Sequence, residues 1–365
     1  MVLDDAIAAQ DGLYVKGLDA GVAKLFRVSY ADNSVREVHL PFPGSIREVT
    51  GSANKDGVLV RIEGWTKSQR VLAVDTKGSR DTGLVKPSPA DFSQIESREF
   101  LVDSYDGIRI PLTVIHRKGL VLDGVRPTIL SGYGAYGISS EPRFDPMNLA
   151  WLERGGVIAI AHVRGGGEFG EEWHQAGQIL TKSNTIQDFV ACAEALIKQG
   201  YTSAEKLAAV GRSAGGITVG GAITERPELF AAANHAVGVS DLLRTENEGT
   251  GPANIVEFGT VKRKYEFLAM HSVSPYHRVV DGTAFPAVIV TTGINDPRVA
   301  PWQPGKFAAR LQSASSSGKP VLLRTDMDGG HGLGGTRNQR VNEISDVWSF
   351  FLATMNEPGF VTQRP

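Results

Sequence analysis

The stretch that decides the fold is Lys206-Leu-Ala-Ala-Val-Gly-Arg-Ser-Ala-Gly-Gly-Ile-Thr-Val-Gly-Gly-Ala-Ile-Thr224. Residues 206–211 have the apolar run of a short buried strand, and residues 215–224 indicate a glycine-rich helix packed closely on a sheet. Gly211 and Gly215 flank Ser213 in the pattern G-x-S-x-G, in which a sharp turn between strand and helix exposes the serine hydroxyl. Because glycine accounts for 42 of the 365 residues, this pattern alone is weak evidence, and the serine needs partners elsewhere in the chain.

Two later segments contain an acid and a base that could serve such a serine. Asp296 follows the β-branched run Phe285–Thr292, which indicates a buried parallel strand. His331 follows a second strand candidate, Pro320–Arg324, and precedes an amphipathic stretch from Asn338 to Met355. Since catalytic groups gather beyond the carboxyl ends of parallel strands, Asp296 and His331 are expected at one edge of the sheet.

The chain order Ser213, Asp296, His331 is the nucleophile–acid–base order of the α/β-hydrolase fold. Each residue also has an ordinary interpretation: Asp296 could cap the turn before Pro297, and His331 could be a surface histidine in a glycine loop. Seven other histidines are present. Three suitable residues in the right order nevertheless favour a Ser-Asp-His triad in an α/β protein with a mostly parallel sheet flanked by helices.

Five motifs together resemble the prolyl oligopeptidase family of serine peptidases. They are the turn around Ser213, Asn295-Asp-Pro-Arg-Val299, Gly329-Gly-His-Gly332, Ser131-Gly-Tyr-Gly-Ala-Tyr-Gly137 and Val163-Arg-Gly-Gly-Gly-Glu-Phe-Gly170. The resemblance covers about residues 95 to 355. It implies an enzyme of two domains, in which a β-propeller caps an α/β-hydrolase domain and admits only short peptides.

The expected chemistry is acyl transfer. His331 takes the proton of Ser213 as the serine attacks an acyl carbon, and Asp296 orients the imidazole and stabilises its charged form. The oxyanion that develops needs hydrogen-bond donors in place, each typically worth about 3 to 4 kcal/mol. One expected donor is the backbone N–H of Ala214. The resemblance implies that the hydroxyl of Tyr133 is the other, although Tyr133 could simply pack between glycines.

The resemblance also implies a substrate pocket. Arg298 matches the family arginine that binds a substrate carbonyl, although a surface salt bridge would explain it equally. Tyr136, Val239 and Phe258 match residues that surround the substrate residue before the cut. Asn254 stands where prolyl peptidases carry a tryptophan that stacks on the substrate proline, and an amide offers no flat apolar face. The preference for proline is therefore expected to be weak.

Residues 1–88 are expected to form a partial β-propeller-like region, and residues 89–365 the α/β-hydrolase catalytic domain. Short alternating runs separated by turn residues predict antiparallel strands in the first region. The segment repeats with a period of about 45 residues. At this spacing Gly12-Leu-Tyr-Val15 aligns with Gly57-Val-Leu-Val60, and Leu25-Phe-Arg-Val28 aligns approximately with Val71-Leu-Ala-Val74. That period fits one four-stranded propeller blade, so about two blades precede the linker Lys86-Pro-Ser-Pro89, whereas propellers typically have about 4 to 8.

Two blades cannot close a ring. The chain is therefore expected to be either part of a longer enzyme or a natural or engineered short form, whose β region is a partial lid or a contact between copies in a homo-oligomer. Both cases leave the site open, which together with Asn254 predicts clear hydrolysis of short-chain carboxylic esters and weaker cleavage of short peptides. A proline-directed serine oligopeptidase and a non-catalytic interaction scaffold are the alternatives.

The remaining signals exclude several classes. The net charge of −2 gives no electrostatic footprint for nucleic acid. No apolar run is long enough for a membrane span, and the N-terminal residues lack the basic start of a signal peptide, so a cytoplasmic location is expected. The single cysteine, Cys192, lies in a helical pattern as a small core residue.

The sequence gives little support for a dinucleotide site or a metal site. Residues 165–170 spell G-x-G-x-x-G after the strand candidate Val157–Ala161, but the acidic residue at the expected distance, Asp188, lies in a helical pattern. The segment is instead expected to be a structural loop near the active site, with Arg164 and Glu168 in local hydrogen bonds. The histidine spacings contain no H-E-x-x-H, so neither a metal nor another cofactor is expected.

Overall fold

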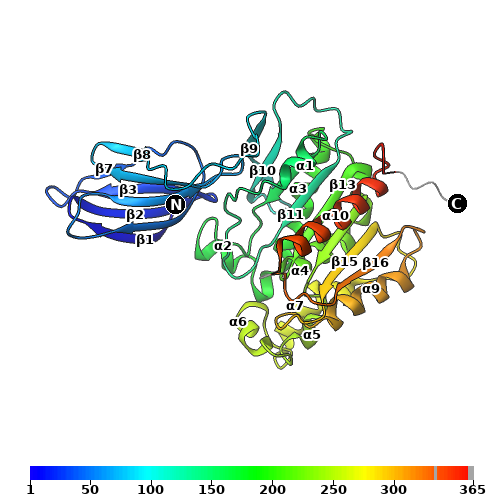
Figure 1. Cartoon of the computed structure of the whole chain (residues 1–365). Coiled ribbons are helices and arrows are strands. Elements are labelled where there is room, and N and C mark those ends of the chain that lie inside the picture. The colour runs from blue at the N-terminus through cyan, green and yellow to red at the C-terminus, as the bar shows by residue number, and fades with distance from the viewer. Residues whose placement is uncertain (333–334, 361–365) are drawn as a thin grey trace.

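The computed structural model describes residues 1–332 and 335–360. The N-terminal strands are β1 (Val2–Ala9), β2 (Gly12–Asp19), β3 (Val22–Val28), β4 (Val35–Glu37), β5 (Ser45–Gly51), β6 (Val58–Glu63), β7 (Arg70–Asp75) and β8 (Gly78–Asp81). They form two four-stranded antiparallel sheets, each in sequence order, which lie beside the larger part of the molecule (Figure 1).

The two sheets repeat one pattern. The segments that match at a period of about 45 residues are β2 and β6, and β3 and β7, the second and third strands of each sheet. Apolar side chains of both sheets join in one cluster, in which Tyr14, Leu25, Ile46 and Val60 are fully buried. The expectation of about two blade-like antiparallel units is confirmed.

The larger part is built on an eight-stranded sheet in the order β16-β15-β14-β13-β11-β12-β10-β9. Its strands are β9 (Ile95–Asp103), β10 (Arg109–Arg117), β11 (Thr128–Gly132), β12 (Val157–Ala161), β13 (Leu207–Arg212), β14 (Ala232–Ala236), β15 (Ala287–Gly293) and β16 (Val321–Asp326). The six strands from β16 to β12 run parallel, and β10 and β9 add an antiparallel edge. The mostly parallel sheet predicted from the sequence is confirmed.

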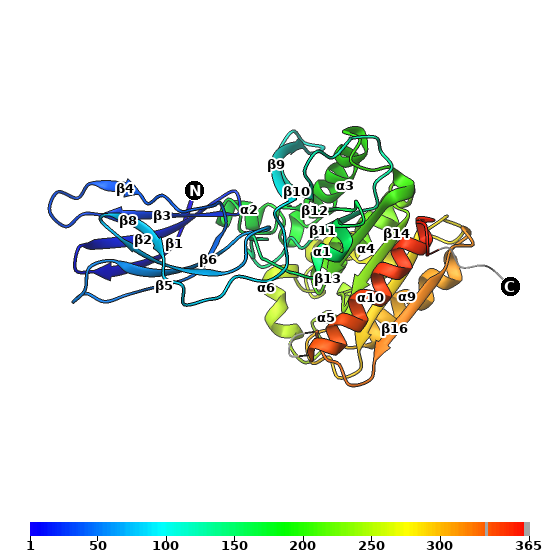
Figure 2. The same ribbon diagram turned by 45° about the horizontal axis from the view of Figure 1, so that its top comes forward.

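Helices cover both faces of this sheet. The α-helices are α1 (Asn148–Leu152), α2 (Glu171–Gln175), α3 (Ser183–Lys198), α4 (Gly215–Glu225), α5 (Leu242–Thr245), α6 (Ile255–Phe258), α7 (Lys264–Val273), α8 (Pro275–Arg278), α9 (Trp302–Ala314) and α10 (Arg337–Thr354). Short 3-10 turns are η1 (Ile179–Thr181), η2 (Ala204–Lys206), η3 (Pro227–Leu229) and η4 (Gly251–Asn254). Buried side chains of α3, α4, α7 and α9 belong to the apolar cluster on one face, and those of α1 and α10 to the cluster on the other. In Figure 2 the helix α10 lies in front of the sheet.

The parallel strands explain where the candidate site lies. Every residue of β14 and β15 is buried, as expected for strands with helices on both sides. Because β11, β13, β15 and β16 run in one direction, the loops after them meet at the same edge of the sheet. Cys192 is buried within α3, as predicted.

The β region joins the larger part through few polar contacts. The hydroxyl of Ser45 and a guanidinium N–H of Arg47 donate to the carbonyl of Pro142 at 2.6 and 3.0 Å. Glu63 accepts from the backbone N–H of Phe144 at 3.0 Å. The division expected at residue 88 lies between β8 and β9 and stays a prediction. Among the described residues, no helix combines the length and apolar character that crossing a bilayer requires.

Candidate active site

Ser213 occupies the tight turn between β13 and α4. Its φ of 56° lies in the left-handed region, which is unfavourable for a residue with a side chain. A Cβ atom on Gly211 would lie 2.1 Å from the carbonyl of Gly215, and one on Gly215 would lie 2.7 Å from the carbonyl of Gly132. Only glycine fits at these two positions, so the pattern G-x-S-x-G is a steric requirement of this turn.

The three residues predicted as a triad are hydrogen-bonded in series. The Oγ atom of Ser213 lies 2.8 Å from Nε2 of His331, and Nδ1 of His331 lies 2.7 Å from Oδ2 of Asp296. The side chains of Asp296 and His331 are buried. Ser213 follows β13, Asp296 follows β15 and His331 follows β16. The fold thus brings Ser213 and His331 together although 118 residues separate them.

Asp296 is held as a carboxylate. Its second oxygen, Oδ1, accepts from the backbone N–H groups of Arg298 at 2.8 Å and Val299 at 3.0 Å. Burial favours the neutral acid, but the hydrogen bonds from His331, Val299 and Arg298 outweigh it and lower the pKa of Asp296. A carboxylate fixed in this way can orient the His331 ring and stabilise its positive charge.

Tyr133 and Ala214 lie beside Ser213, where hydrogen-bond donors to an oxyanion were expected. Burial raises the pKa of the Tyr133 phenol, although the charge of Arg298 and the hydroxyl of Ser213 oppose the shift. The hydroxyl is therefore a protonated donor at neutral pH. Ala214 directly precedes α4, at the helix end where backbone N–H groups have no partner within the helix.

Two of the predicted pocket residues, Asn254 and Phe258, contact a third, Tyr136. Its hydroxyl donates to Oδ1 of Asn254 at 3.0 Å, and its ring meets that of Phe258 edge to face, with centroids 5.5 Å apart. The backbone N–H of Val239 donates to the carbonyl of Ser213 at 3.0 Å. Arg298 is exposed, and its charge acts on both Tyr133 and Tyr136. Asn254 is thus a hydrogen-bond partner of Tyr136, which the sequence did not predict.

Four polar residues at the site, three of them buried and one, His174, half-buried, were not predicted. They are Lys182, Glu257, His174 and Thr218, whose side chains contact either the loop after β11 or one another. Glu257 is the sequence neighbour of the predicted pocket residue Phe258, and Thr218 lies in the predicted helix after Ser213, but neither was itself predicted as a site residue. A charged residue at the start of a helix is usually solvated, so the sequence offered no sign that Lys182 is buried.

The G-x-G-x-x-G segment has a structural role. The guanidinium of Arg164 donates to Asp188 at 2.9 and 2.6 Å, and its backbone N–H donates to the same carboxylate at 3.0 Å. Ser104 also donates to Asp188, at 2.6 Å. Glu168 accepts from the backbone N–H of Ser140 at 2.8 Å. The expected local hydrogen bonds of Arg164 and Glu168 are present, and the Asp188 carboxylate is fully engaged within the protein.

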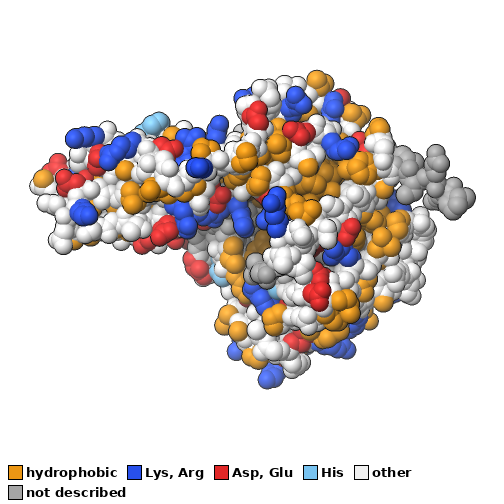
Figure 3. Space-filling view, in the orientation of Figure 1, with side chains coloured by type: hydrophobic (Ala, Val, Ile, Leu, Met, Phe, Trp, Pro, Cys, Tyr) orange, Lys and Arg blue, Asp and Glu red, His pale blue; other side chains and the backbone are white. Residues whose placement is uncertain are grey.

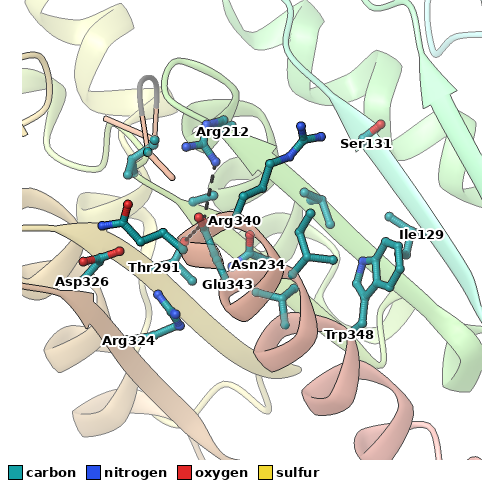
Figure 4. Close-up of a pocket in the computed structure, with 18 of the residues that line it drawn as sticks. Ile129, Ser131, Arg212, Asn234, Thr291, Arg324, Asp326, Arg340, Glu343 and Trp348 are labelled. Atoms are coloured by element: carbon teal, nitrogen blue, oxygen red, sulfur yellow. Dashed lines mark hydrogen bonds and ion pairs between the residues drawn. The ribbon is translucent and has the colours of Figure 1, made fainter. Parts of the chain in front are cut away.

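A cavity of about 710 Å³ lies on the other side of the sheet, under α10. Its lining includes Ile129, Arg212, Glu343 and Trp348 (Figure 4), and hydrophobic side chains gather on this face of the molecule (Figure 3). Arg212 and Glu343 approach to 3.7 Å there. Within the described residues the lining leaves out Ser213, Asp296 and His331 themselves but includes Arg212, Gly330 and Gly332, so the cavity adjoins the loops that contain the candidate active site.

In residues 1–332 and 335–360, no group of three or more His, Cys, Asp and Glu side chains is arranged to hold a metal ion.

The fold is that of an α/β-hydrolase, with Ser213 in the turn between β13 and α4. Residues 142–358 match the model of the prolyl oligopeptidase family, and the chain belongs to this family. The expected resemblance is therefore confirmed.

Individual relatives agree with this assignment. The chain is 42% identical to a prolyl endopeptidase of Elizabethkingia meningoseptica over 88% of this chain and 46% of the relative. It is 32% identical to Protease 2 of Moraxella lacunata over 96% of this chain and 51% of the relative. Among solved structures, oligopeptidase B of Trypanosoma brucei superposes with a TM-score of 0.89 at 30% identity, over 99% of this chain and 53% of that structure. The chain thus spans about half the length of the relatives it matches.

Proposed function

We propose that the chain is a serine hydrolase that forms an acyl-enzyme on Ser213. The observation that carries this proposal is the hydrogen-bonded series from Ser213 through His331 to Asp296, built on a strained turn at the carboxyl edge of the sheet. Membership of a peptidase family supports the same chemistry. A non-catalytic scaffold would have no use for the strain at Ser213.

The geometry supports a two-step reaction. Nε2 of His331 accepts the hydroxyl proton as Oγ of Ser213 bonds to the acyl carbon, and the carbonyl electrons move to oxygen. The Tyr133 hydroxyl and the Ala214 N–H donate to that oxyanion. When it collapses, the leaving group departs with the proton from His331. A water molecule then loses a proton to His331, attacks the acyl carbon and releases the acid, and Ser213 recovers its proton.

The proposed substrates are short peptides and short-chain carboxylic esters. The names of the relatives support peptides. The amide of Asn254, hydrogen-bonded to Tyr136, supports a pocket without a stacking surface for proline. Esters with good leaving groups need no protonation of the departing atom, so this pocket should hydrolyse p-nitrophenyl acetate or butyrate faster than a Gly-Pro amide.

The first experiment is labelling with a fluorophosphonate. We expect the parent chain to be labelled, and Ser213→Ala to lose the label and up to about a millionfold in kcat on a p-nitrophenyl ester. Ser313→Ala, at an exposed position in α9, is the matched control and should behave like the parent. Ester turnover by Ser213→Ala within about tenfold of the parent would show that another residue is the nucleophile.

The second experiment ranks substrates. A panel of p-nitrophenyl esters and of X-Pro, X-Ala and X-Phe amides is measured on one preparation. The proposal predicts higher kcat/KM for the esters and little discrimination among the amides. A Gly-Pro amide with kcat/KM above that of the esters would instead establish the alternative, a proline-directed oligopeptidase.

The domain division at residue 88 and association through the β region are part of the proposal. In the described residues β4 and β8 lie at the open edges of their sheets, and unpaired edges favour contact between chains. Sedimentation equilibrium of the 365-residue chain tests the association: a single monomer species would contradict it.

A further inference from the structure

Two buried charged side chains hold one short loop of the candidate active site. The loop is residues 133–137, directly after β11, and it contains Tyr133. Lys182 donates from its ammonium to the carbonyl of Gly134, and Oε1 of Glu257 accepts from the backbone N–H of Tyr136 at 2.9 Å. Lys182 and Glu257 are each only 1% exposed. The loop backbone is thus hydrogen-bonded by buried charged side chains at Gly134 and at Tyr136.

A third side chain completes the arrangement. The hydroxyl of Thr218 in α4 donates to the carbonyl of Tyr133 itself at 2.8 Å. The three contacts come from separate places: the residue before α3, the helix α4 and the short helix α6. The loop contains three residues with positive φ, namely Gly134, Tyr136 and Gly137. Such a backbone has no regular hydrogen-bond ladder of its own, so side chains from its surroundings fix its course.

Burying the charges of Lys182 and Glu257 lowers the free energy of unfolding, because each charge loses its hydration. An ammonium taken out of water costs several kcal/mol unless it is well partnered. Among the described residues, the hydrogen-bond partner of Lys182 is the Gly134 carbonyl, and the Phe258 ring lies 5.7 Å from Nζ. Glu257 also pairs with Nε2 of His174 at 2.7 Å. Because apolar side chains often stabilise such a site equally well, these charges point to a role other than stability.

The ionisation of Lys182 is consistent with such a role. Burial lowers the pKa of Lys182 to about 8, although the charge of Glu257 opposes the shift. The side chain is therefore still protonated at neutral pH, when its hydrogen bond to Gly134 is needed.

We propose that Lys182 and Glu257 are positioning residues that hold the loop 133–137 so that the Tyr133 hydroxyl is fixed at the oxyanion. This inference rests on the proposed function, because it requires Tyr133 to donate to the oxyanion. Both side chains are buried and contact the backbone of the loop. Their effect passes through Tyr133, and a shift of about 1 Å in such a donor costs on the order of 100-fold in rate.

The test is a double-mutant cycle on a p-nitrophenyl ester. We expect Tyr133→Phe to lower kcat about 100- to 1000-fold, as removal of an oxyanion donor does. Lys182→Met should lower kcat about 10- to 100-fold. KM should change less than about threefold, because binding of the ester does not require the Tyr133 hydroxyl in its exact position. In the Tyr133→Phe background, Lys182→Met should lower kcat by less than about threefold, since the donor it positions is already gone.

Lys206→Met is the matched control. Lys206 also donates to a backbone carbonyl, that of Met355 at 2.6 Å, but it lies away from the site. This variant should lose stability and keep the parent kcat. If Lys182→Met does not give folded protein, Glu257→Met, which removes the oxygen that accepts from the Tyr136 N–H at a similar side-chain size, takes its place in the cycle with the same expectation.

The outcomes separate the two proposals. A parent-like kcat for the folded Lys182 or Glu257 variant, or a loss that is undiminished in the Tyr133→Phe background, overturns the positioning role alone. A parent-like kcat for Tyr133→Phe overturns the oxyanion role of Tyr133 and with it the positioning role, whereas only Ser213→Ala tests the nucleophile.

Discussion

Asn254 is the residue at which substrate preference can be tested most directly. Replacing it by tryptophan adds the flat apolar ring that the resemblance places at this position in prolyl peptidases. Ring stacking is worth about 0.5–1.5 kcal/mol, so Asn254→Trp should raise the ratio of kcat/KM for a Gly-Pro amide to that for a p-nitrophenyl ester about two- to tenfold. Asn254→Ala is the control: it removes the hydrogen bond with Tyr136 but adds no ring, and it should leave the ratio low. An unchanged ratio in Asn254→Trp would mean that position 254 does not face the residue before the cut.

His235 makes the stability of the chain depend on pH. This histidine of β14 is fully buried behind the nucleophile turn, where its ring lies 4.9 Å from that of Phe307. Burial lowers its pKa from 6.5 to about 4, although backbone hydrogen bonds oppose the shift. Between these values the unfolded chain binds a proton that the folded chain does not, so the free energy of unfolding falls as the pH falls, by about 3 kcal/mol from this residue.

Urea unfolding at pH 6.5 and pH 4 measures this effect. His235→Asn should be less stable at both values, but its loss between the two should be smaller than that of the parent by about 3 kcal/mol. His39→Asn, at an exposed position, should keep the pH dependence of the parent. Equal losses in the parent and His235→Asn would show that His235 is not held neutral.

The local sequence predicted the position of site residues that directly follow a strand. It did not predict buried charged residues whose partners lie far away in the sequence. Ser213, Asp296 and His331 each follow an apolar run, so their meeting at one edge could be predicted, while their catalytic roles stay predictions. Lys182 precedes α3 and Glu257 lies in α6, and whether such a charge is buried depends on neighbours distant in the sequence.

The turn between β13 and α4 is the element whose geometry tolerates least change. In Gly211→Ala the new methyl group would lie 2.1 Å from a backbone carbonyl, which cannot move without displacing Ser213. We expect a less stable protein with kcat lowered at least tenfold, measured by thermal unfolding and ester turnover. Gly305→Ala is the matched control, because a Cβ atom there meets only the end of Leu323 at 3.9 Å, within helix α9.

Gly305→Ala should raise the free energy of unfolding by up to about 1 kcal/mol, through the higher helix propensity of alanine, and leave kcat unchanged. Parent-like activity in Gly211→Ala would contradict the steric account of the turn.

Elements were predicted best where they carry a motif. The strand expected at 206–211 is β13 at Leu207–Arg212, the strand expected at 157–161 is β12, and the helix expected at 338–355 is α10 at Arg337–Thr354. The hairpin of β9 and β10 was not predicted, and neither was the place of β12 between β10 and β11. The order of strands in a sheet depends on which strands pair along their edges. The sequences of β11 and β12 are both short apolar runs, so they do not indicate which strand pairs with which neighbour.

At the scale of the whole molecule, Glu63 connects the β region to the hydrolase part. One carboxylate oxygen accepts from Arg47 at 2.7 Å, and the other accepts from the backbone N–H of Phe144 across the junction at 3.0 Å. Arg47 in turn donates to Pro142. Two residues of the second sheet thereby hold the segment around Phe144, which belongs to the larger part.

Glu63→Ala should therefore loosen the junction without unfolding either part. We expect faster amide hydrogen exchange in residues 139–147 and a loss of about 1–3 kcal/mol in the free energy that protects them, because removal of the charged acceptor leaves the half-buried N–H of Phe144 without its partner. Glu48→Ala is the matched control, since Glu48 pairs at 3.2 Å with Arg61 on the exposed face of the same sheet. Equal exchange of residues 139–147 in the two variants would mean that the Glu63 carboxylate does not restrain the junction and that the contacts of Ser45 and Arg47 with Pro142 suffice. Faster exchange confined to Glu63→Ala would identify the Glu63 carboxylate as a link through which the β region restrains the hydrolase part.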